Sequence, residues 1–176
     1  MNVVQELAAR TLLVILAAAV VQDFMYMKIS NRLILMGILF SLAFGLTTGG
    51  PKQVIYVLAN LSFPVIVLYL LYLLGVLGAG DIKLFSIIGG FTNFRLLISC
   101  MFFSFVAAAV IAVCKMLYNR NFCGSLLRAG IYFRSLRQEG IVSYHKEWAE
   151  HRNLMHFSVA ILIGYIAAVA VQVLRK

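Results

Sequence analysis

The sequence predicts an all-α integral membrane protein with about six transmembrane helices. Of its 176 residues, 63% are hydrophobic and only 12% are charged, whereas a soluble domain carries about a quarter charged residues. A chain of this length has no interior large enough to bury so much apolar surface, so the lipid bilayer is its natural solvent. Prolines are few and the polar stretches are short, which predicts a single membrane-embedded domain over residues 1–176.

Six apolar segments underlie this prediction. They extend over residues 3–22, 33–48, 54–77, from about 81 onward, 96–117 and 154–174. The turn Gly49-Gly50-Pro51 separates the second from the third. Gly89-Gly90 interrupts the fourth, which is weak. Because a crossing needs about 20 residues, the second and fourth segments have the least certain boundaries.

Positive charges predict the orientation, because cytoplasmic loops are enriched in Lys and Arg. If the loop after the first helix is cytoplasmic, that side holds residues Lys28, Arg32, Lys83, Lys115, Arg120, Arg128, Arg134, Arg137, Lys146 and Arg152. The opposite side holds Lys52, Arg95 and the terminal Arg175-Lys176. The N-terminus is therefore expected outside. The net charge of +9 is accordingly attributed to topology and anionic lipid headgroups rather than to nucleic acid.

The one long connection, from Lys115 to Arg152, carries a helical apolar pattern. Its apolar residues recur at spacings of four and three: Phe122, Leu126, Ala129, Phe133 and Leu136. Basic residues border this face, which is typical of an amphipathic helix on the cytoplasmic membrane surface. A basic loop that only obeys the positive-inside rule is the alternative.

Two aspartates are the candidate catalytic groups. Of the six acidic residues, three lie in the long connection and Glu6 has Arg10 as an i,i+4 partner. Asp23 and Asp81 remain, each at the edge of an apolar segment, where an ionisable group usually marks function. Aspartyl proteolysis requires such a pair, because one carboxylate activates water while the other, protonated, hydrogen-bonds the scissile carbonyl. No metal site or cofactor is expected, because the cysteines and histidines have no ligand spacing.

The residues around Asp81 favour a substrate site. Gly78 and Gly80 would let a substrate backbone approach closely and would permit positive φ. Asp81 would then open a helix as its N-cap. Lys83 would orient substrate or contact Asp81, although reaching toward lipid headgroups explains it equally well. A plain capped loop is the alternative for the glycines and aspartate.

Residues 78–84, which read Gly-Ala-Gly-Asp-Ile-Lys-Leu, resemble the Gly-x-Gly-Asp-x-Lys-Leu signature of bacterial type IV prepilin peptidases. These belong to the Gly-x-Gly-Asp intramembrane aspartyl proteases. In that family the first catalytic aspartate precedes a basic-Ile-Pro-Asn element, and here Asp23 precedes Lys28-Ile29-Ser30-Asn31. Ser30 departs from the usual proline. Gly89-Gly90-Phe91 resembles the glycine pair that follows the signature.

The resemblance implies a multi-pass enzyme of the bacterial cytoplasmic membrane. It would cleave the short basic leader of prepilin-like substrates at the cytoplasmic face, after a glycine. The chain looks like the short form associated with Flp/Tad-type pili, because nothing in it matches the paired-cysteine region of the longer enzymes. N-methyltransferase activity is therefore not expected. The resemblance names no particular prepilin and fixes no oligomeric state.

Two other functions remain open from the residues alone. A small proton-coupled transporter or channel subunit would also need membrane carboxylates, although these would lie near the bilayer midplane. A structural assembly subunit would pair its aspartates with a partner's cations.

Helix dipoles predict which aspartate of the pair is ionised. The positive end of the helix after Asp81 favours its carboxylate, and the negative end of the first helix favours protonated Asp23. Asp23 is therefore expected to carry the shared proton.

Overall fold

The computed structural model describes residues 3–27, 29–74, 76–118 and 157–174, and every regular element in these ranges is a helix. The helices are α1 (Val3–Tyr26), α2 (Asn31–Leu73), α3 (Ala79–Phe91), α4 (Phe94–Tyr118) and α6 (Phe157–Leu174). The predicted all-α class is therefore confirmed for this part of the chain. The predicted surface helix over Phe122–Leu136 lies outside the described residues.

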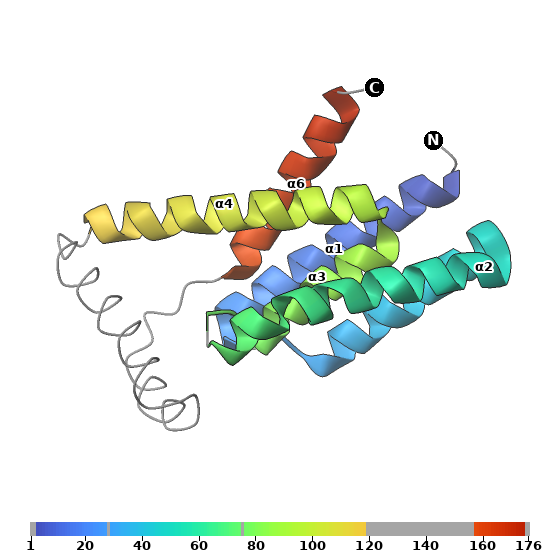
Figure 1. The fold of residues 1–176 in the computed structure, drawn as a ribbon, viewed down its shortest axis with the longest axis horizontal. Coiled ribbons are helices and arrows are strands. Elements are labelled where there is room, and N and C mark those ends of the chain that lie inside the picture. The colour runs from blue at the N-terminus through green and yellow to red at the C-terminus, as the bar shows by residue number, and fades with distance from the viewer. Residues whose placement is uncertain (1–2, 28, 75, 119–156, 175–176) are drawn as a thin grey trace.

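Helix α2 is a hairpin of two limbs. Its only residue with non-helical backbone angles is Gly50, at φ 65° and ψ −156°, a left-handed φ that favours glycine. The first limb (residues 31–49) and the second limb (residues 51–73) run back along each other (Figure 1). Next to the turn the limbs pack closely, since a Cβ added to Gly45 would lie 2.9 Å from Cγ2 of Val57. The predicted turn at Gly49-Gly50-Pro51 is confirmed.

The prediction of about six spans is not confirmed. Four of the described helices, α1, α2, α4 and α6, are long and apolar enough to cross a membrane. Helix α3 has 13 residues, so it is about 20 Å long and shorter than a bilayer core of about 30 Å. The fourth predicted span is therefore a short helix enclosed by the others.

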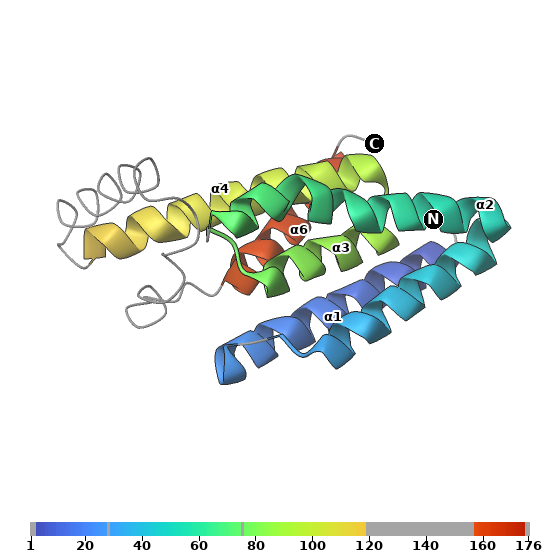
Figure 2. The same ribbon diagram turned by 60° about the horizontal axis from the view of Figure 1, so that its bottom comes forward.

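Helix α3 lies between the limbs of α2. Figure 2 shows α3 between the two limbs, with α4 and α6 on the side of the second limb. Nearly all of its side chains from Ile82 onward are buried, Lys83 excepted. The predicted interruption at Gly89-Gly90 is wrong, because the helix continues to Phe91. The two glycines instead allow close packing, since added Cβ atoms would meet the Asn60 carbonyl oxygen and the Ser41 hydroxyl of α2.

The end of α1 and the starts of α3 and α6 lie at the same end of the bundle (Figure 1). The turn of α2 and the connection from α3 to α4 lie at the opposite end. α1 contacts α2, α3 and α6. This arrangement brings the helix ends that carry Asp23, Asp81 and Ser158 into one region.

Candidate active site

Asp23 lies in the last turn of α1, which extends past the predicted end at Gln22 to Tyr26. Met27 then adopts a left-handed φ of 51°, which is uncommon for a residue other than glycine. Its backbone N–H donates to the Asp23 carbonyl oxygen at 2.9 Å. The helix therefore closes on the turn that holds Asp23, and the chain reverses toward α2.

The half-buried side chain of Asp23 is held from a distant helix. The Oγ of Ser158 donates a hydrogen bond to its Oδ2 at 2.6 Å. Ser158 is 1% exposed and lies in the first turn of α6. Sequence reasoning missed this residue. The available signal was a serine hydroxyl at the start of a mostly apolar helix.

Asp81 is the third residue of α3 rather than its N-cap, so that prediction is wrong. The N-cap is Gly78, with φ −78° and ψ 149°. The Gly78 N–H donates to Oδ2 of Asp81 at 3.3 Å, and the Asp81 N–H donates back to the Gly78 carbonyl at 3.1 Å. Because the carboxylate reaches back to the N-cap, it satisfies a backbone donor at the start of the helix. Asp81 also lies near the positive end of the α3 dipole.

Other groups of the protein lie in the space where Gly78 and Gly80 would carry side chains. A Cβ on Gly78 would lie 3.0 Å from Oδ2 of Asp81, and one on Gly80 would lie 3.2 Å from Cδ1 of Ile29. The expected positive φ is wrong for both, because Gly78 has φ −78° and Gly80 is inside α3. Both glycines therefore have an internal packing role.

The connection after Asp23 packs on the start of α3. Ile29 contacts Gly80, and the Lys83 Nζ donates to Oδ1 of Asn31 at 2.9 Å. These contacts join the Lys28–Asn31 element to the Gly78–Leu84 signature. The two segments that resemble the family motifs therefore pack against each other. Asp23 precedes one of them, and Asp81 lies within the other.

Ser30, which replaces the usual proline, makes two hydrogen bonds in this connection. Its backbone N–H donates to Oε1 of Gln22 at 3.0 Å, a bond that proline cannot form. Its Oγ accepts from the Arg32 N–H at 3.2 Å and caps α2. The serine thus fixes the connection to the residue beside Asp23.

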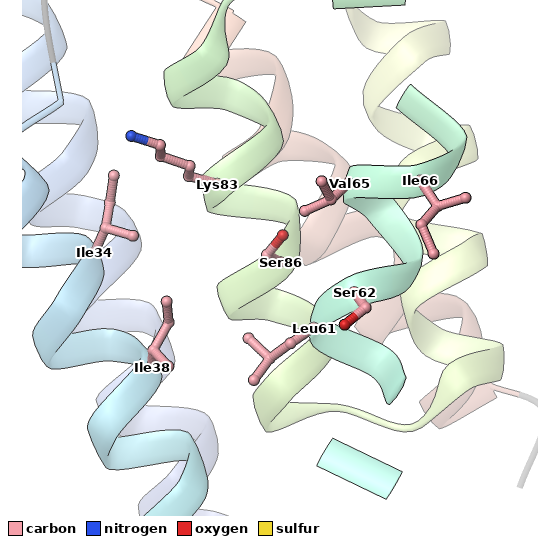
Figure 3. Close-up of a pocket in the computed structure, with 8 residues that line it drawn as sticks. All are labelled: Ile34, Ile38, Leu61, Ser62, Val65, Ile66, Lys83 and Ser86. Atoms are coloured by element: carbon pink, nitrogen blue, oxygen red, sulfur yellow. The ribbon is translucent and has the colours of Figure 1, made fainter. Parts of the chain in front are cut away.

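A groove of about 300 Å³ runs beside Lys83 between α3 and the two limbs of α2 (Figure 3). Ile34 and Ile38 of the first limb line one wall. The other lining residues are Leu61, Ser62, Val65 and Ile66 of the second limb and Lys83 and Ser86 of α3. Ser62, Val65 and Ile66 are exposed, so the groove opens on the outer surface of the bundle.

Charged groups elsewhere in the described ranges play a different part. Arg10 forms the expected i,i+4 ion pair with Glu6 at 2.8 Å, in the first half of α1 and away from Asp23. Among the residues with described positions, no three His, Cys, Asp or Glu side chains form a group that could hold a metal ion.

The sequence pattern of the type IV leader peptidase family matches residues 11–113. This stretch covers more than half of the chain and contains both aspartates. The chain belongs to this family. The suspected prepilin-peptidase relationship is thereby confirmed, and membership implies peptidase activity on a prepilin-like substrate. No curated protein and no solved structure gives a significant match. The matched stretch of the leader peptidase ends before α6, so Ser158 lies beyond it.

Proposed function

We propose that the chain is an intramembrane aspartyl endopeptidase of the bacterial cytoplasmic membrane. It would cleave the short basic leader of prepilin-like substrates at the cytoplasmic face. The observation that supports this most is the packing of the connection after Asp23 on the start of α3, through Ile29–Gly80 and Lys83–Asn31. Those contacts link the segments that carry the two carboxylates.

Asp23 and Asp81 would act as a general acid and base. Two carboxylates in one desolvated site share a proton because both cannot ionise at close range. The ionised member takes a proton from water, and the protonated member donates to the scissile carbonyl oxygen. The reaction needs no covalent intermediate, so no serine or cysteine nucleophile is required.

Gly78, Gly80 and Lys83 are proposed to contact substrate. Asp81 and Ile29 already occupy space beside the two glycines, so the room left for substrate there would suit only a small residue, such as glycine, before the scissile bond. The groove beside Lys83 offers apolar walls to the hydrophobic segment that follows the leader.

Cleavage by purified variants tests the proposal. Asp23→Asn and Asp81→Asn should each abolish cleavage of a prepilin-like peptide in detergent or liposomes, because one carboxylate cannot fill both roles. Glu6→Gln is the matched control: it makes the same change from acid to amide on α1 and should leave the rate unchanged. If either aspartate variant kept substantial activity, the proposal of an aspartyl endopeptidase would be contradicted.

Mass spectrometry of the products locates the cut bond in the same assay. We expect one cleavage after a small residue and, with S-adenosylmethionine present, no added methyl group on the new N-terminus. Cleavage after a bulky residue would contradict the proposed contact of Gly78 and Gly80 with a small substrate residue. A methylated product would contradict an enzyme with peptidase activity alone.

A further inference from the structure

The start of α6 is fixed against the helices that surround the aspartates. The ring of Phe157 packs against Phe85 of α3 and Phe105 of α4, with centroid distances of 6.3 and 5.9 Å. Phe85 lies one turn after Asp81 on α3. The neighbouring residue, Ser158, is thereby held in a defined position.

The hydrogen bond from Ser158 to Asp23 is short. O–H···O bonds in proteins measure about 2.5–3.0 Å and are commonest near about 2.7–2.8 Å. The Ser158–Asp23 distance is 2.6 Å, and Ser158 is buried. A buried hydroxyl that lost this partner would have to find another, so the bond restrains both side chains.

We infer that Ser158 is a positioning residue for Asp23: its hydroxyl holds the carboxyl group in one orientation. The inference rests on the proposed function, and it extends the site to a helix beyond the matched stretch of the family.

Few other ionisable groups face this end of α1 within the described residues. Helix α3 carries Asp81 and Lys83 there, and α2 begins with Arg32 next to its N-terminus. The described part of α6 has Tyr165 as its ionisable side chain, about two turns further along. The Ser158 hydroxyl is one contact to Asp23 that a single substitution can remove.

Ser158→Ala tests the inference in the full-length protein. We expect kcat to fall about tenfold to a hundredfold with little change in KM, because the bond acts on Asp23 rather than on substrate. Ser158→Thr keeps the hydroxyl and should restore most of kcat.

Ser104→Ala is the matched control. Ser104 is also fully buried, lies against Gly164 of α6 and donates to the Cys100 carbonyl oxygen of its own helix at 2.7 Å. Its loss should leave kcat unchanged. If Ser158→Ala has the wild-type kcat, or loses activity and stability only as Ser104→Ala does, the inference is overturned.

A readout independent of activity separates this inference from the proposed function. Asp23 and Asp81 are the only aspartates in the chain, so ¹³C-aspartate in Asp81→Asn protein reports on Asp23 alone. The carboxylate infrared band of Asp23 should shift on Ser158→Ala and stay in place on Ser104→Ala. A shifted band with no peptidase activity in the wild type would contradict the proposed function alone, and an unshifted band would contradict the hydrogen bond.

Discussion

The hydrogen bond between Lys83 and Asn31 is the single-residue contact that ties the two motif segments together. Both side chains are exposed, and the donor–acceptor distance is 2.9 Å. A bond of this kind contributes about 0.5–1.5 kcal/mol. Its value to the enzyme would be to keep the connection after Asp23 seated on α3.

A double-mutant cycle measures that coupling. Lys83→Ala and Asn31→Ala should each lower kcat/KM about two- to tenfold. The kcat/KM of the double variant should be no lower than that of the less active single variant. Lys52→Ala, a cation at the opposite end of the bundle, should have no effect. Fully additive losses would mean that Lys83 and Asn31 act independently of the hydrogen bond between them.

The sequence misjudged the surroundings of Asp23 and Asp81, whose catalytic role stays a prediction. Asp81 is favourable both as an N-cap and in the first turn of a helix, so sequence alone could not place the helix start at Gly78. The partner of Asp23 could not be predicted either, because Ser158 lies 135 residues away and only the packing of α6 brings it near.

Helix α3 is the element on which the proposed site depends, and its seating between the limbs of α2 needs Gly89. A Cβ there would meet the backbone carbonyl of Asn60, which cannot move without shifting α2. Overpacking of this kind costs about 1–3 kcal/mol. Gly45 offers a contrast, because its added Cβ would meet a Val57 methyl group at 2.9 Å, and a side chain adjusts more easily than a backbone.

Gly89→Ala should therefore lower the free energy of unfolding in detergent by about 1–3 kcal/mol and reduce the cleavage rate. Gly45→Ala should be nearly neutral, because the gain in helix propensity of about 1 kcal/mol offsets the smaller strain. Denaturant titrations of both variants give the comparison. Equal stability of the two variants would show that α3 is not seated as described.

The sequence predicted the long helices and the turn at Gly50 because length, apolarity and glycine chemistry are local properties. It misjudged α3, because Gly89-Gly90 reads as a break when the neighbours are unknown. Close packing against α2 makes the same pair favourable inside a helix. The contacts of α3 with α2, which cannot be read from the sequence, explain why this helix continues through the glycine pair.

In the molecule as a whole, the basic residues are distributed between the two ends of the helix bundle. Arg32, Lys83 and Lys115 belong to the helix ends that lie with Asp23 and Asp81, whereas Lys52 and Arg95 lie near the opposite end. The positive-inside rule then predicts that the aspartate end faces the cytoplasm.

Cysteine labelling checks this orientation. In protein that lacks Cys100, Cys114 and Cys123, a single cysteine at position 52 should react with an impermeant reagent outside intact cells. One at position 115 should react only after permeabilisation. Labelling of both from the same side would contradict the topology and the cytoplasmic cleavage that depends on it.

The most direct test of the account is whether Asp23 and Asp81 form one site. In ¹³C-aspartate protein, replacing either aspartate by asparagine should shift the carboxyl infrared band of the other, because the two groups would share one proton at close range. Bands that stay in place when the other aspartate is replaced would contradict a shared catalytic site.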